Sequence, residues 1–200
     1  FVGEAMAIGE RTPLALLKDQ VEAQLDHLCT LRFTQEDLAY LGTLPYLKSD
    51  FLDFLRIFQF QREFITVVAD GDKLRIDATG PQIHVMLFEI FVLSIVNELY
   101  FRQFDQEAAV AEARVRLAAK IALIKEAVST HKRRHPYEVF DFGGRRRFSG
   151  ELHDEVVGTF VREIPDVFKG TSNLYLARKY GIAAIGTMAH EYLQTFQAVG

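Results

Sequence analysis

The chain has 200 residues, of which 49% are hydrophobic and 25% charged, so it can build one sizeable domain or two small ones with a real core. Its formal net charge of −4 gives no general attraction to nucleic acid or to an anionic membrane, so any basic site must be local. The single cysteine, Cys29, excludes a disulfide framework and a cysteine-based metal site. We therefore expect a globular protein of a reducing, cytoplasmic setting.

The first part of the chain has the pattern of three helices. In residues 12–31 apolar side chains recur every three or four positions, which is helical periodicity. Thr34 is followed three residues later by Asp37, a capping-box signal for a second helix. Ser49 with Asp53 nearby predicts the start of a third helix.

A β-hairpin is predicted next. The runs 64–69 and 73–79 are rich in β-forming residues, and Asp70-Gly71 lies between them. This is the strongest short-range hairpin signal in the sequence.

Two long helices are expected after the hairpin. The first, from about residue 83 to 104, is the most apolar part of the chain, and its Glu89, Asn97 and Glu98 favour a buried helix over a membrane span. If Glu89 is buried it must find a partner. The second, over about 106–131, has apolar positions expected to face one way: Val110, Val115, Leu117, Ile121 and Ile124.

From Tyr137 onward, strand patterns alternate with helical ones. The segments "YEVFDF", "DVFKGTSN" and "IAAIGTMAH" each begin as a strand, and a helical pattern follows each. This β-α-β-α-β-α order predicts an α/β fold with a parallel sheet or barrel. Because such folds build their sites at the carboxyl ends of the strands, "DFGGRRR", "KGTSN" and "GTMAHE" are expected to converge on one pocket.

The first of these loops combines flexibility with positive charge. Gly143 and Gly144 allow a sharp turn and a close ligand, and Arg145, Arg146 and Arg147 offer forked donors suited to carboxylates and phosphates. Because successive side chains point in different directions, at most one or two of these three arginines can face a pocket. The alternative is that all three pair with surface acids.

The other two loops add hydroxyls and a histidine. Residues 170–173, "GTSN", are typical of an anion-friendly helix N-terminus, and equally of an ordinary turn and cap. Thr187 and His190 lie three apart, and the histidine is either a structural hydrogen-bonding residue or a nucleophile or base near neutral pH. The residues alone thus predict a local anion site and a small anionic substrate, without naming the reaction.

These motifs resemble a known family. The segments "DFGGRRRFSGELHDEVV", "GTSNLYLARKYG" and "GTMAHEY", in this order and spacing, resemble bacterial nicotinate phosphoribosyltransferases. The earlier "LPYLKSDFLDFLRIFQF" and "GPQIHVMLFEIFVLSIVNEL" are similar to that family too. The resemblance implies an N-terminal α+β domain in residues 1–105. It implies for 106–200 a bridging helix and the first β-α units of an irregular phosphoribosyltransferase-type α/β barrel.

The resemblance also implies a reaction. The ring nitrogen of nicotinate displaces pyrophosphate from the anomeric carbon of phosphoribosyl pyrophosphate, with Mg²⁺ on the diphosphate, as a step of NAD biosynthesis from nicotinate. The family couples this to hydrolysis of ATP through a phosphorylated histidine, whose matching position is His190. No metal ligand is assigned in this chain.

Further site residues follow from the same resemblance. Arg145 matches a ligand-contacting arginine, Thr187 a residue at the nicotinate site, and Phe142 an aromatic that packs on the pyridine ring. Ser172 is a further substrate-binding candidate. Relatives that use nicotinamide carry an aspartate at the position of Asn173, where a carboxylate would repel nicotinate.

The resemblance also implies that part of the site lies outside this chain. An Asp-x-Tyr-Lys-type motif of the family is absent, and later barrel strands would follow Gly200. We therefore expect a piece of a longer protein that acts as a homodimer with shared active sites. Its expected partners are small molecules (nicotinate, phosphoribosyl pyrophosphate and ATP), with neither nucleic acid nor membrane. Alternatives are a nicotinamide or quinolinate phosphoribosyltransferase, or a catalytically silent nucleotide-binding paralogue.

Overall fold

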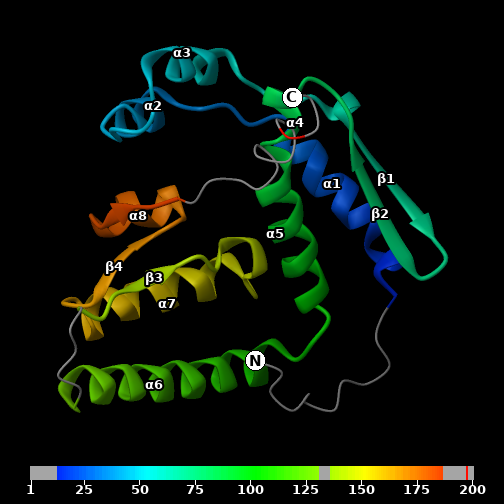
Figure 1. Ribbon diagram of the computed structural model, residues 1–200. Helices are drawn as coiled ribbons and strands as arrows, with labels where there is room; N and C mark the ends of the chain where they lie inside the picture. Colours follow the sequence, from blue (N-terminus) through cyan, green and yellow to red (C-terminus); the bar gives the residue numbers. More distant parts are fainter. Residues whose placement is uncertain (1–12, 131–135, 187–196, 198–200) are drawn as a thin grey trace. The chain divides into compact units, whose positions relative to one another are not determined.

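The computed structural model describes residues 13–130 and 136–186 together with residue 197 (Figure 1). Contacts divide the chain into two compact units. The first holds the described residues up to Gln106 and also Arg145–Ser149, and the second holds Glu107–Gly144 and the described residues from Gly150 onward. Each unit has a hydrophobic core of its own.

The first unit begins with short helices, as the sequence predicted. They are the 3-10 helix η1 (Leu14–Leu17), α1 (Lys18–Leu28), α2 (Gln35–Leu41) and α3 (Ser49–Ile57). The capping box of α2 is confirmed, because the Asp37 N–H donates to Thr34 Oγ1 at 3.1 Å and the Thr34 N–H donates to Asp37 Oδ2 at 3.0 Å. The predicted start of the third helix at Ser49 is confirmed, although Ser49 is not its cap. Ser49 is the first helical residue, and Lys48 occupies the cap position without a side-chain bond.

The predicted hairpin is present, and Figure 1 shows its two strands beside α1. Strands β1 (Ile65–Asp70) and β2 (Lys73–Ala78) pair antiparallel, with Asp70 opposite Lys73. The turn therefore comprises Gly71 and Asp72, one residue later than expected. Gly71 has φ +58°, a conformation that glycine adopts without steric cost.

The apolar helix differs from the prediction in two ways. It is divided into α4 (Gln82–Val85) and α5 (Phe88–Phe101), and only Phe88, Ser94 and Leu99 of α5 are buried. Phe88 and Leu99 are eleven positions apart, about three turns, so they share the face that packs into the core of this unit, whereas Ser94 lies about a third of a turn away from them. Apolar residues on its other sides stay exposed within the unit, among them Ile90, Phe91 and Leu93.

In the part of the chain that the structure describes, Gln82–Phe101 is the one helical stretch long and apolar enough to cross a membrane by length and composition. Core helices of soluble proteins satisfy the same criterion, so this property alone assigns no location.

The second unit contains the predicted alternation from the first to the third strand, and the helix predicted after the third strand lies almost wholly outside the described residues. Its elements are α6 (Gln106–Thr130, of which Gln106 belongs to the first unit), β3 (Val139–Asp141), α7 (Gly150–Glu163), β4 (Phe168–Thr171), α8 (Leu174–Tyr180) and β5 (Ala183–Ala184). The strands form one parallel sheet in the order β3-β4-β5, which confirms the α/β class.

The core of the second unit joins α6, α7, β4 and α8. Val157 and Phe160 of α7 pack in one cluster with Ile121 and Ile124 of α6. The prediction that Val115 shares the buried face of α6 is wrong, because Val115 is 65% exposed. Positions 121 and 124 are three apart and share a face, whereas 115 points elsewhere.

Candidate active site

The ends of β3 and β4 lie side by side and bring two of the predicted loops together. Asp141 is the last residue of β3 and is the register partner of Thr171, the last residue of β4. The Thr171 hydroxyl donates to Asp141 Oδ2 at 2.6 Å, and the Ser172 N–H donates to the Asp141 carbonyl at 2.8 Å. The segments "DFGG" and "KGTSN" are therefore neighbours at one edge of the sheet.

Asp141 is a buried carboxylate, only 7% exposed. Burial raises its pKa, but the hydrogen bonds from His153, Thr171 and the Gly143 N–H have the larger combined effect. The pKa of Asp141 therefore lies below its ordinary value. Asp141 is thus ionised at neutral pH and acts as a fixed acceptor at the strand ends.

Phe142 and Asn173 lie at this edge and offer different chemistry. Phe142 is 51% exposed, so its ring can take a planar ligand on its face. Asn173 caps α8, since its Oδ1 accepts the Leu176 N–H at 3.1 Å. The Nδ2 group of Asn173 can only donate, whatever Oδ1 accepts. Ser172 between them is half-buried.

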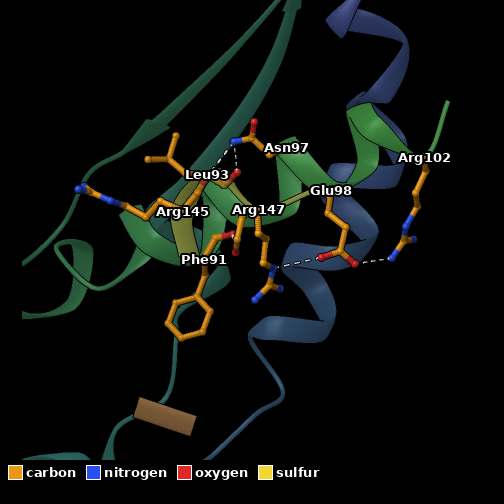
Figure 2. A network of polar contacts seen from close by, with 8 residues as sticks. Phe91, Leu93, Asn97, Glu98, Arg102, Arg145 and Arg147 are labelled. Atoms are coloured by element: carbon orange, nitrogen blue, oxygen red, sulfur yellow. Dashed lines mark hydrogen bonds and ion pairs between the residues drawn. The ribbon is translucent and has the colours of Figure 1, made fainter. Parts of the chain in front are cut away.

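The arginine segment belongs to the first unit and is held by α5 (Figure 2). Arg145 forms an ion pair with Glu89, and its carbonyl accepts from Asn97 Nδ2 at 3.1 Å. Arg147 Nε lies 3.3 Å from Glu98 Oε2. Arg102 NH2 lies 2.9 Å from Glu98 Oε1, so Glu98 binds two arginines.

These contacts answer two questions that the sequence left open. Glu89 is half exposed and has Arg145 as its partner, so it is not a buried acid. The alternative in which arginines of the run pair with acids holds for Arg145 and Arg147.

The two pairs differ in their environment. The Arg145 and Glu89 side chains are 54% and 49% exposed, and such a pair contributes only about 0–1 kcal/mol. The Arg147 and Glu98 side chains are 29% and 17% exposed, and Arg102 adds to that pair. An incoming anion can therefore displace Glu89 from Arg145 at little cost, whereas Arg147 is held in a structural network.

Two predicted site residues, Thr187 and His190, lie outside the described residues. Sequence reasoning did not identify His153, which donates to Asp141 from α7. A signal was available: residues 153, 157 and 160 share one helix face, so a histidine stands on the stripe that Val157 and Phe160 bury.

A cavity of about 530 Å³ lies elsewhere in the second unit. It lies between α6 and α7, with Leu117, Ile121 and Thr159 among its lining residues. Two ion pairs bridge these helices, Arg114 with Glu155 and Lys125 with Glu163. None of the residues at the ends of β3 and β4 lines this cavity, so we do not assign it to the site.

A parallel sheet with polar loops at adjoining strand ends defines an α/β protein of the kind that binds ligands at the carboxyl edge. Family models match both parts of the chain. The one described as the nicotinate phosphoribosyltransferase (NAPRTase) N-terminal domain matches residues 10–97, and the one described as the nicotinate phosphoribosyltransferase (NAPRTase) family matches residues 137–200.

Individual relatives agree with these matches. A nicotinate phosphoribosyltransferase of Herminiimonas arsenicoxydans is 61% identical over 94% of this chain and 47% of its own length. One of Chromobacterium violaceum is 51% identical over 94% of this chain and 48% of its own length. The chain belongs to the nicotinate phosphoribosyltransferase family, and it spans about half the length of the curated relatives it matches.

Solved structures share the fold. A crystal structure of nicotinate phosphoribosyltransferase from Vibrio cholerae matches with a TM-score of 0.80 and 30% identity, over 96% of this chain and 46% of that one. One from Porphyromonas gingivalis matches with a TM-score of 0.77 and 30% identity, over 97% of this chain and 47% of that one. The fold is therefore that of part of a nicotinate phosphoribosyltransferase.

Proposed function

We propose that the full-length protein is a nicotinate phosphoribosyltransferase. It would form nicotinate mononucleotide and pyrophosphate from nicotinate and phosphoribosyl pyrophosphate, in NAD biosynthesis from nicotinate. The observation that carries the proposal is the 61% identity to a nicotinate phosphoribosyltransferase over 94% of the chain.

In this reaction the nicotinate ring nitrogen forms a bond to the anomeric carbon, and the bond from that carbon to the diphosphate oxygen breaks. The electron pair leaves with the diphosphate, so negative charge grows on the departing oxygens. We assign Arg145 to stabilise this charge. The backbone of Arg145 is held by its hydrogen bond from Asn97, and a positively charged group that is already in position needs little reorganisation during the reaction. Its exposed pair with Glu89 is compatible with exchange for a substrate anion.

Recognition of the pyridine ring is assigned to Phe142, Ser172, Asn173 and Thr187. The half-exposed ring of Phe142 suits stacking on pyridine. Asn173 suits the acid over the amide because its Nδ2 group donates and carries no negative charge. An aspartate would cap α8 equally well but would repel the nicotinate carboxylate.

Coupling to ATP is assigned to His190 as the residue that is phosphorylated. An imidazole nitrogen can accept a phosphoryl group, and the added charge would favour the productive state of the site. The described residues contain no group of three or more side chains of the types that hold metal ions. Mg²⁺ is assigned to the substrate diphosphate, where it would neutralise charge, since Mg²⁺ usually binds through phosphates and few carboxylates.

The remaining parts of the proposal concern the setting. We propose a cytoplasmic homodimer with shared active sites whose ligands are small molecules, without nucleic acid or membrane partners. The net charge of −4 agrees with the absence of a nucleic-acid partner.

The test is an assay of the full-length protein with nicotinate, nicotinamide and quinolinate in turn, with phosphoribosyl pyrophosphate and Mg²⁺, with and without ATP. The expected result is mononucleotide formation from nicotinate alone, strengthened by ATP. A reaction with nicotinamide or quinolinate instead would assign the protein to that substrate. No reaction with any of the three would favour a catalytically silent nucleotide-binding paralogue.

The variant His190→Ala tests the coupling. We expect it to lose stimulation by ATP while some uncoupled synthesis remains. Unchanged stimulation in this variant would contradict the assignment of His190.

A further inference from the structure

The buried Asp141 connects more of the molecule than its strand. Its Oδ2 accepts from Thr171 Oγ1 at 2.6 Å and from His153 Nε2 at 2.8 Å, and its Oδ1 accepts from the Gly143 N–H at 2.9 Å. We call Asp141, His153 and Thr171 the Asp141 cluster. It ties α7 to the ends of both β3 and β4.

His153 adds a directed bond to this cluster. The side chain is 5% exposed, and because an ionised carboxylate only accepts, the hydrogen of the pair must be on Nε2. Its Nδ1 is buried and has no hydrogen-bond partner among the described residues. An unpaired buried polar atom destabilises the folded state. If packing alone mattered, an apolar side chain at position 153 would therefore give a more stable protein than histidine. The bond to Asp141 is what the imidazole contributes instead.

The glycine loop lies directly against this pair. A Cβ added at Gly143 would be 3.0 Å from Asp141 Oδ1 and 3.5 Å from His153 Nε2. One added at Gly144 would be 3.9 Å from His153 Cε1. The backbone at Gly143 therefore lies too close to the carboxylate for an unhindered side chain, while Gly144 is in ordinary contact range of the imidazole.

The second loop is tied to the cluster through Thr171, which is 0% exposed. Its hydroxyl donates to Asp141 and accepts the Asn173 N–H at 3.0 Å. Each donor in this series has an acceptor, from His153 through Asp141 and Thr171 to Asn173. The imidazole is thus connected to both loops through hydrogen bonds.

We propose that His153 and Thr171 are positioning residues that act through Asp141 to hold residues 142–144 and 172–173 in the geometry needed for substrate. The proposal rests on the proposed function, since these loops carry Phe142, Ser172 and Asn173. Catalytic groups must be held to within about 0.5 Å, and an error of about 1 Å costs about a hundredfold in rate.

The test compares His153→Leu with His153→Gln in the full-length protein. Leucine fills similar volume without a donor, and glutamine places an amide N–H near the position of Nε2. We expect kcat/KM for nicotinate to fall about 10–100-fold in His153→Leu and to stay within about threefold of wild type in His153→Gln. An equal fall in both variants, or less than a threefold fall in His153→Leu, would overturn the proposal.

Val157→Ala is the control for lost packing. Val157 is fully buried one turn further along the same face of α7 and touches none of the hydrogen bonds above. It should lower Tm at least as much as His153→Leu yet keep kcat/KM near that of wild type. If it loses as much activity, general destabilisation explains the effect and the positioning role is wrong.

A second pair of variants serves if His153→Leu does not fold. Thr171→Val keeps the shape of the side chain and removes the hydroxyl, and Thr171→Ser keeps the hydroxyl. We expect a loss of at least tenfold in kcat/KM for the valine variant and a smaller loss for the serine variant. The reverse order would contradict the proposal.

Amide hydrogen exchange separates this proposal from the proposed function. Peptides covering residues 142–144 and 172–173 should exchange faster in His153→Leu than in wild type or Val157→Ala. An inactive wild type would refute the proposed function, and exchange would then decide whether the cluster orders the loops. Unchanged exchange in His153→Leu would refute the positioning role in either case.

Discussion

The close approach of β4 and β5 allows a sharp prediction for Gly170→Ala. Gly170 is buried and pairs with Ala183, and a Cβ at this position would lie 2.3 Å from the Ala183 carbonyl oxygen and 3.1 Å from its carbon. To reach ordinary van der Waals contact, the carbonyl would have to retreat by about 1 Å. The obstacle is backbone, so no side-chain rotation can relieve it.

The cost follows from what this movement disrupts. The ladder of β4 and β5 has two register pairs, Gly170 with Ala183 and Thr171 with Ala184, so a displaced Ala183 affects half of it. Overpacking of this kind costs about 1–3 kcal/mol or more. Since the Tm shift per kcal/mol falls with chain length, from about 4–8 °C below 100 residues to about 2–4 °C near 200, a full-length protein of about twice this length should lose about 1 °C or more.

Differential scanning calorimetry of the full-length protein measures this shift. Gly186→Ala is a matched control, because no atom of the described residues beyond its own chain neighbours lies within 4 Å of a Cβ built there, and its effect should stay within about 0.5 kcal/mol. Equal Tm values for Gly170→Ala and Gly186→Ala would show that the two strands do not approach as closely as described.

Three more predictions concern a cap, a charge and an ion pair. Thr34→Ala should cost about 1 kcal/mol in urea unfolding and Thr34→Ser little, because only the hydroxyl receives the Asp37 N–H; equal losses would exclude the capping box as the cause. The pKa of Asp141 lies below its ordinary value of 3.8, so its stabilising effect is present above that pH and lost as pH falls through the pKa in the folded state. The stability difference between wild type and Asp141→Asn should therefore be constant from about pH 5 to 7 and narrow in acid, and a difference that grows in acid would contradict this sign. Glu89→Gln should leave Tm nearly unchanged and lower KM for phosphoribosyl pyrophosphate by up to about fivefold, because the exposed pair with Arg145 contributes at most about 1 kcal/mol. Glu98→Gln is its control and should lower Tm without lowering KM, since Glu98 binds Arg147 and Arg102.

The site was predicted only in part. The sequence placed "DFGG" and "KGTSN" at strand ends, and the parallel register of Asp141 with Thr171 brings them together. It did not predict that Arg145 would pair with Glu89, 56 positions away. Nor did it predict the bond from His153 to Asp141, because the partner of a polar side chain depends on which surfaces pack together.

The sequence by itself determined the features that depend on neighbouring residues. The capping box at Thr34, the hairpin around Gly71 and the β-α alternation after Tyr137 each follow from spacings of a few positions, and these spacings fix local backbone geometry. The tertiary structure alone decided which face of α5 is buried and which acids hold the arginines. An apolar helix has several faces that could meet a core, and only the packing of the other elements selects one.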